Sequence, residues 1–331
     1  AGTDFRAAAD LDYADAFFRS AIEQTFVDMY KAIASCNNVI AHIENTNMVF
    51  NSKSRKRIIT GELYGLRAAL HFELLRLFAA APVVDLTAKA IPYSTTYPDK
   101  VPARYTTGEV LGKIIADFEA ALPLLAVNDL KLDALKTAST RFAANDSYAC
   151  DYEKALAAAA EVYDACSSWF PLTDYSTAGK VQGAVKLYDD IIFAAYDQYL
   201  AKNYNDVMLS NQTNFILALR NPKKRFTATE QKYDVRYKYC VNQPDAEEQE
   251  DVYTSCKYVK YTGTTGSDYD SGDTQGALIP VIRMSEVILI MAECKARGAA
   301  EGTVADAVSD LSTLVYKKRV RTGSVSASDF D

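Results

Sequence analysis

The clearest pattern of hydrophobic and polar positions lies in residues 61–84, GELYGLRAALHFELLRLFAAAPVV. Leucine recurs there at intervals of three and four residues, and this spacing is typical of one buried face of an α-helix. The stripe consists of Leu63, Leu66, Leu70, Leu74 and Leu77. The charged side chains of the segment, Arg67 among them, fall off this face. Pro82 cannot continue the helical hydrogen bonds, so we expect Val83 and Val84 to be extended.

The same spacing recurs elsewhere and predicts a mainly α-helical protein built from helix pairs. Residues 26–44 and 54–80 form the first expected pair, and residues 106–125 begin with TTGE, the spacing of a capping box. Further helices are expected over residues 151–166 and in a last pair hinged at residues 298–302. Helix pairs that each expose an apolar face must stack to bury it, so we predict a tetratricopeptide-like scaffold.

Residues 171–279 differ from the rest of the chain. Tyrosine, asparagine, glycine and proline become frequent, and helical periodicity fades except around residues 184–200. Residues 261–276, YTGTTGSDYDSGDTQG, read as a polar, glycine-rich loop. We therefore expect a single domain over the whole chain, with a helical scaffold at residues 1–170 and 280–321 and a large irregular insertion between them.

The composition argues against two classes of function. The chain has 43 acidic and 36 basic residues and a net charge of -7, which is the wrong sign for a surface that neutralises phosphates. Nucleic acid is therefore not expected as a partner. No apolar run approaches the roughly 18 residues that a membrane span requires, so a transmembrane helix is not expected either.

The cysteines do not form a metal or redox motif. Six are scattered through the chain without a C-x-x-C pair, so neither a zinc knuckle nor a thioredoxin-type site is predicted. Cys240 and Cys256 bracket a polar, turn-rich stretch. Whether they form a disulfide stays open, because sequence spacing does not test the geometry that a disulfide requires.

The sequence contains no recognisable catalytic or metal-binding motif. The two histidines, His42 and His71, lie on expected helices outside any H-E-x-x-H motif, and we interpret both as structural. Asp268, Asp270 and Asp273 suggest a calcium loop, but Asp273 stands where the EF-hand template needs glycine. We predict no enzyme activity, no cofactor and no metal.

Six segments, taken in order, resemble the successive signatures of the SusD/RagB family. They are YKAIASCNNVIAHIE (30–44), GELYGLRAALHFELLRLFAAAPVV (61–84), ARYTTGEVLGKIIADFEAALPLL (103–125), DYEKALAAAAEVYDA (151–165), YDVRYKY (233–239) and PVIRMSEVILIMAECKARG (280–298). Each segment is a weak signal by itself, and the order of all six makes the resemblance strong. It implies a scaffold of tetratricopeptide-like helix pairs with the ligand site in irregular insertions, here residues 171–279.

The resemblance also implies roles for three pairs of charged residues. Glu62 with Arg67, Asp234 with Arg236, and Arg283 with Glu286 stand at charged positions that recur in the family. We interpret them as framework ion pairs and caps rather than ligand contacts.

Members of this family are outer-membrane lipoproteins of Gram-negative bacteria that bind glycans or, in some cases, peptides, and act as lids on TonB-dependent transporter barrels. The resemblance therefore implies a surface-exposed nutrient-binding protein of the outer membrane. Its expected partners are a SusC-like TonB-dependent barrel and an oligosaccharide or peptide ligand, with membrane contact only through a lipid anchor. The alternative is a tetratricopeptide-type scaffold that binds another protein and no small ligand.

The chain departs from the family pattern in several places. Members usually carry a lipid-bearing cysteine near the mature N-terminus, whereas the first cysteine here is Cys36, inside an expected helix. The family typically continues beyond the segment that ends here at Asp331, and the helix before Asp151 is shortened. We expect that residues are missing internally and at both ends and that the full protein is longer.

Ligand contacts are expected from tyrosines and amides outside the helices. Aromatic rings supply flat apolar area for stacking, and amides supply paired donors and acceptors, so together they suit a polar ligand such as a sugar. Trp169, the single tryptophan, is expected to be a packing residue. The predicted ligand-binding residues are Tyr93, Tyr97, Tyr199, Tyr204, Asn205, Asn211 and Asn214.

Overall fold

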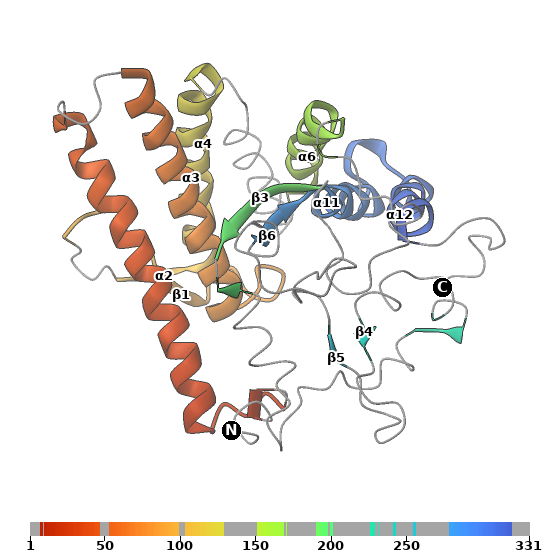
Figure 1. Ribbon diagram of the computed structural model, residues 1–331, viewed down its shortest axis with the longest axis horizontal. Coiled ribbons are helices and arrows are strands. Elements are labelled where there is room, and N and C mark those ends of the chain that lie inside the picture. The colour runs from red at the N-terminus through yellow and green to blue at the C-terminus, as the bar shows by residue number, and fades with distance from the viewer. Residues whose placement is uncertain are drawn as a thin grey trace, which may run out of the picture. The chain divides into compact units, whose positions relative to one another are not determined.

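The protein is mainly α-helical in a computed structural model, as the sequence predicts (Figure 1). The structure describes residues 7–8, 10–46, 53–98, 103–128, 151–168, 170, 190–197, 199–200, 226–228, 231, 241–242, 254–255 and 278–319. Contacts divide the chain into two compact units. One contains Asp12–Cys166 and Leu289–Ala307, and the other contains Ala1–Leu11, Ser167–Ile288 and Val308–Asp331. The single domain and the tetratricopeptide-like detail remain predictions.

Three long helices lie side by side in the first unit: α2 (Ala16–His42), α3 (Lys53–Phe78) and α4 (Thr107–Asn128) (Figure 1). The short 3₁₀-helix η1 (Ile43–Asn45) follows α2 directly. Helix α2 begins ten residues before the predicted start. Asp15 caps it by accepting a hydrogen bond from the Phe18 amide at 2.8 Å, and this satisfies an amide that has no partner within the helix.

The predicted capping box at the start of α4 is confirmed. The Thr106 hydroxyl accepts from the Glu109 amide at 3.2 Å, and the Glu109 carboxylate accepts from the Thr106 amide at 2.7 Å. Before it, β1 (Lys89–Pro92) and β2 (Arg104–Thr106) form an antiparallel pair with an irregular register. This ribbon carries the chain from the end of α3 to the start of α4.

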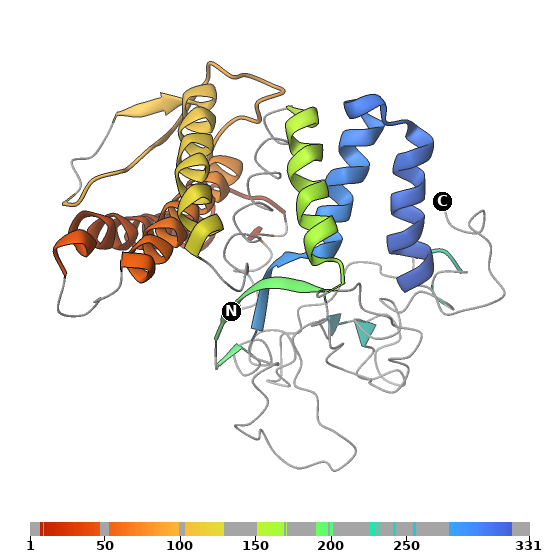
Figure 2. The same cartoon turned by 90° about the horizontal axis from the view of Figure 1, so that it is seen from above.

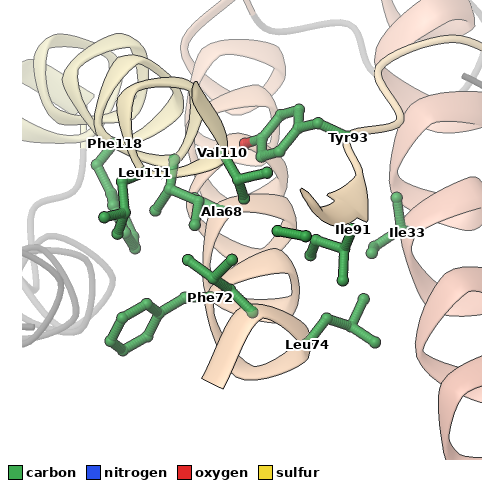
Figure 3. Packing of buried hydrophobic residues seen from close by; sticks show 12 residues of the cluster. Ile33, Ala68, Phe72, Leu74, Ile91, Tyr93, Val110, Leu111 and Phe118 are labelled. Carbon is green, nitrogen blue, oxygen red and sulfur yellow. The ribbon is translucent and has the colours of Figure 1, made fainter. Parts of the chain in front are cut away.

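The hydrophobic core of this group lies between α3, α4, β1 and one face of α2 (Figure 3). Helix α3 contributes Ala68, Phe72, Leu74 and Leu75, all at most 2% exposed. Most of the remaining cluster comes from the neighbouring elements and includes Ile33, Ile91, Val110, Ile114 and Phe118. Helix α3 is therefore buried on more than one side.

The predicted leucine stripe is only partly the buried face of α3, since Leu74 is 0% exposed but other members of the stripe are not buried. Leu66 and Leu77 are 44% and 63% exposed, whereas Arg67, which the pattern placed off the buried face, is 4% exposed. The reason is that α3 packs against both α2 and α4, and period-3.6 reasoning assumes one buried side. Gly61 also lies at the α4 contact, where an added Cβ would meet the Leu125 side chain at 2.9 Å.

Further along the chain, α6 (Tyr152–Cys166) and the 3₁₀-helix η3 (Ala299–Glu301) contact each other within the first unit. The last predicted helix pair consists of α11 (Met284–Ala296) and α12 (Val304–Arg319), with η3 between them. Gly298 has φ +84°, a left-handed conformation that favours glycine, which explains the predicted hinge there.

Strands β3 (Ile191–Tyr196) and β6 (Leu278–Arg283) pair antiparallel in the second unit (Figure 2). Two shorter strands, β4 (Val241–Asn242) and β5 (Thr254–Ser255), form another pair. The helical periodicity around residues 184–200 is therefore misleading, because residues 191–196 are a strand. The segment IIFAAY is rich in β-branched and aromatic residues, which favour a strand once a partner strand lies alongside.

Arg67 and Arg283 are two of the charged residues that the resemblance singles out. Each forms a framework ion pair with a residue far away in sequence. Arg67 pairs with Asp117 at 2.6 Å and Arg283 pairs with Asp190 at 2.6 Å. Asp234 and Arg236 lie outside the described residues.

Several other sequence predictions fall partly or wholly outside the described residues. Cys36 and Cys294 are buried, but Cys240, Cys256 and Trp169 lie outside the described part of the chain. Among the residues that the structure describes, no helix is both long and apolar enough to cross a bilayer.

Candidate functional site

The best-defined candidate site is the loop of residues 93–98, which follows β1. Tyr97 near its tip is 46% exposed, while Tyr93 at its base is 4% exposed. The peptide bond between Tyr97 and Pro98 is cis. Of the two predicted tyrosines, Tyr97 faces solvent and Tyr93 belongs to the buried core cluster (Figure 3).

A buried ion pair lies beneath this loop. Arg67 of α3 donates two hydrogen bonds to Asp117 of α4, from Nε to Oδ2 at 2.7 Å and from Nη2 to Oδ1 at 2.6 Å. Such a bidentate pair fixes the guanidinium plane. The Tyr93 hydroxyl donates to the same Asp117 Oδ2 at 2.6 Å, so the base of the loop is bonded to the ion pair.

Side chains from α2 and α3 also hold the loop backbone. The Tyr30 hydroxyl donates to the Pro92 carbonyl at 2.7 Å, and the Ser94 amide donates to His71 Nε2 at 3.1 Å. Asn37 Nδ2 donates to the Ser94 hydroxyl at 3.1 Å. The residues that precede Tyr97 are therefore fixed by helices that are distant in sequence.

His71 is a structural residue, as predicted. Its Nδ1 lies 2.9 Å from the Arg67 carbonyl oxygen, which can only accept, so Nδ1 carries the proton and Nε2 accepts from Ser94. Its ring stacks on Tyr93 with centroids 3.9 Å apart. Because the side chain is buried and both nitrogens are bonded, it has no free group for a substrate.

The electrostatics of this network keep His71, Tyr93 and Arg67 each in one protonation state near neutral pH. Burial lowers the pKa of His71 to about 4. Burial, followed by the charge and the hydrogen bond of Asp117, raises the pKa of Tyr93 above its ordinary value. Burial acts to lower the pKa of Arg67, but the hydrogen bond and charge of Asp117 prevail and raise it. The network is built for rigidity and not for proton transfer.

A second group of exposed aromatic residues lies on and after β3. Tyr196 is 61% exposed and Tyr199, one of the predicted site residues, is 57% exposed. The Tyr199 amide donates to the Asp197 carboxylate at 2.8 Å, which orders the turn that displays it. Sequence reasoning selected Tyr199 but not Tyr196, which lies in the same segment. The run IIFAAY, with its β-branched and aromatic residues, was the available signal for a strand that ends at Tyr196.

A surface groove of about 330 Å³ lies at the C-terminal end of α2. Asn38, Val39, His42, Ile43 and Thr46 line it. His42 Nδ1 is hydrogen-bonded to the Asn38 carbonyl oxygen at 2.7 Å, so Nδ1 carries the proton and Nε2 is the acceptor of the neutral ring. None of these residues was predicted as a ligand contact.

The remaining predicted site residues, Tyr204, Asn205, Asn211 and Asn214, lie outside the described residues, as do the aspartates of the loop at 261–276. Among the residues that the structure does describe, no group of three or more His, Cys, Asp or Glu side chains could hold a metal ion. The predicted ligand-binding role of the whole set remains untested.

Residues 12–150 match the model of the SusD-like family described as starch-binding and associating with the outer membrane. No match is found among curated proteins. Solved structures with a similar fold include a SusD-like carbohydrate-binding protein from Bacteroides vulgatus, with 18% identity and a TM-score of 0.67. A SusD superfamily protein from Bacteroides thetaiotaomicron has 19% identity and a TM-score of 0.69. A laminarin-binding SusD-like protein has 16% identity and a TM-score of 0.58.

These alignments cover most of this chain but less of the other proteins. The alignment with the Bacteroides vulgatus protein covers 92% of this chain and 63% of that protein. The corresponding values are 89% and 66% for the Bacteroides thetaiotaomicron protein and 90% and 72% for the laminarin-binding protein. The chain therefore spans less than two thirds of the length of the first two similar structures.

Proposed function

Residues 12–150 belong to the SusD-like family and the chain has the SusD fold, and from this we propose that the protein binds a glycan at the surface of the bacterial outer membrane. Several proteins that share this fold are described as carbohydrate-binding or laminarin-binding, and the matched family is described as starch-binding. Binding without catalysis is the corresponding proposal for this chain.

One observation indicates where on this molecule the glycan would bind. Tyr97 is a half-exposed aromatic ring on a loop whose base is bonded to a buried ion pair. Because the backbone that leads to Tyr97 is hydrogen-bonded to the helices, the loop loses less freedom when a sugar stacks on the ring, and less of the binding energy is spent on ordering. Tyr196 and Tyr199, which belong to the other compact unit, are proposed as a separate glycan contact because both rings are exposed.

Replacing Tyr97 by alanine is expected to weaken glycan binding on the order of tenfold, because loss of one central aromatic contact costs about 1.4 kcal/mol. A glycan array beside a peptide library would first identify the ligand, and titration calorimetry would then compare the wild type with Tyr97→Ala. The matched control is Tyr13→Ala, since Tyr13 is 62% exposed but lies outside the loop. Equal affinities of the wild type and Tyr97→Ala would refute a site at this loop.

A peptide ligand is the second ligand class that we carry forward. An exposed tyrosine stacks on a peptide as well as on a sugar, and amide side chains bind either backbone or hydroxyl groups. The peptide library is therefore part of the same experiment, and selective peptide binding would replace the glycan in this proposal.

We further propose that the protein is a lipid-anchored lid of a TonB-dependent transporter barrel. A protein that only binds a nutrient contributes to uptake when another protein carries the nutrient across the membrane. Mild detergent extraction of native membranes followed by purification should recover this protein together with such a barrel. Recovery of the protein alone, while other outer-membrane complexes survive the same extraction, would refute this role.

A scaffold that binds another protein remains the second candidate function, because α12 exposes an apolar stripe. Val304, Val308 and Leu311, at helical positions i, i+4 and i+7, are 65%, 53% and 38% exposed. Exposed apolar stripes of this kind are typical of helix–protein contacts. Thermal stabilisation by the ligand separates the two functions, since a ligand at 100 times its Kd adds about 2.7 kcal/mol and a pure scaffold gains nothing.

A further inference from the structure

We propose that Asn37 is the positioning residue of the loop at residues 93–98. Its buried side-chain amide connects the Arg67–Asp117 ion pair to the loop and so determines how Tyr97 is presented. This inference deepens the proposed function and rests on it for the role of Tyr97 in binding. The connection itself is a property of the molecule without any ligand.

The orientation of the Asn37 amide follows from its partners. Asn37 is 2% exposed. Its Oδ1 accepts from Arg67 Nη1 at 2.8 Å, and a guanidinium can only donate, so the oxygen must face Arg67. The NH₂ group therefore faces the loop, where it donates to the Ser94 hydroxyl at 3.1 Å and makes a long hydrogen bond of 3.5 Å to the Thr96 carbonyl.

The ion pair restrains the Asn37 amide through Arg67. Asp117 binds the guanidinium through both carboxylate oxygens, so Arg67 Nη1 has one position from which to reach Asn37. The same carboxylate accepts the Tyr93 hydroxyl. One carboxylate thus restrains the loop along two routes, directly through Tyr93 and through Arg67 and Asn37 to the residues just before Tyr97.

The route through Asn37 is the one that reaches the exposed end of the loop. Tyr93 and Ser94 are buried, and their other partners, Asp117 and His71, hold only the base. Thr96 is exposed and lies directly before Tyr97. Of the hydrogen bonds described for this loop, the one from Asn37 to the Thr96 carbonyl lies nearest to Tyr97.

An isosteric substitution separates positioning from core packing. Asn37→Asp keeps the shape and the acceptor for Arg67, so the contact with the ion pair is retained. It replaces the NH₂ group by an oxygen that faces the Thr96 carbonyl, and two acceptors repel each other. The Ser94 hydroxyl can rotate and donate to the new carboxylate, so the loss concentrates at Thr96 and Tyr97. Ser94→Ala removes the other hydrogen bond of the Asn37 NH₂ group to the loop, the one that Asn37→Asp can replace, and leaves α2 unchanged.

The test uses the full chain without ligand and with 3-fluorotyrosine at position 97, observed by fluorine NMR. Amide hydrogen exchange is measured in parallel at Ser94 and, as a core reference, at Leu75. The control is Ile33→Val, a change one helical turn away on α2 at a residue that is 0% exposed and part of the apolar core. The wild type and the control should each give one narrow fluorine signal.

In Asn37→Asp the fluorine signal should broaden or split, while exchange at Ser94, whose amide stays bonded to His71, and exchange at Leu75 each change by less than about twofold. Ser94→Ala should change the fluorine signal in the same direction. An unchanged signal in a folded Asn37→Asp protein would overturn the inference. If that variant does not fold, an unchanged signal in Ser94→Ala would overturn it instead. A Tyr97→Ala variant that binds glycan normally would refute the binding site and leave the fluorine result standing.

Discussion

Replacing Arg67 by methionine is expected to lower the free energy of unfolding by about 3–5 kcal/mol. The substitution removes the charge that compensates Asp117, and it also leaves the Asn37 carbonyl oxygen without the donor that orients it. The side chains of Arg67 and Asp117 are only 5% and 12% exposed, so water cannot replace the lost partner easily. Urea unfolding followed by circular dichroism gives the difference.

An exposed ion pair provides the control. Lys31 and Asp28 lie 2.8 Å apart on α2, with side chains 66% and 56% exposed. Lys31→Met should leave the unfolding midpoint unchanged, because solvent already screens this pair. If Arg67→Met cost no more than this control, the buried pair would not be the support that we assign to it.

Acid is expected to destabilise the protein through His71. The pKa of this side chain is lowered to about 4 by burial, against 6.5 for an ordinary histidine, so the unfolded chain binds the proton more readily. The contribution of His71 to stability is therefore complete above pH 6.5, declines as the pH falls from 6.5 to 4, and changes little below that. The loss amounts to about 3 kcal/mol, from 1.36 kcal/mol for each pH unit of the difference.

The variant His71→Gln isolates this effect from the titration of carboxylates. Glutamine can still donate to the Arg67 carbonyl and accept from the Ser94 amide, the two bonds of the native imidazole, but it does not titrate. The stability of the wild type should fall more steeply than that of the variant between pH 6.5 and pH 4. Parallel profiles would show that His71 takes up its proton equally well in the folded and unfolded chains.

These two predictions concern the same few residues as the proposed site. Protonation of His71 would place a donor opposite the Ser94 amide, and loss of Arg67 would release Asn37. Both changes act on the segment before Tyr97. Glycan affinity measured on the same variants would therefore report whether the loop must be rigid in order to bind.

The sequence by itself determined the features that depend on local spacing. The helices, the capping box at Thr106 and Glu109, and the end of α3 before Pro82 follow from residues within one or two turns of each other. The order of the six family signatures is equally a property of the chain, and it pointed to the fold that the structure has. It also placed Tyr97 and Tyr199 outside the helices, where both are exposed.

Only the tertiary structure decided which faces are buried and which side chains meet. Periodicity assumes one buried side, but α3 lies between α2 and α4, so Arg67 is buried and Leu77 is exposed. Asn37 and Asp117, the side-chain partners of Arg67, are 30 and 50 residues from it along the chain, and no local pattern records that distance. Tyr93 and Tyr97 look alike in sequence. In the structure the Tyr93 hydroxyl donates to the buried Asp117 carboxylate. The Tyr97 ring lies beyond the last hydrogen bond of the loop, from Asn37 to Thr96, and is exposed.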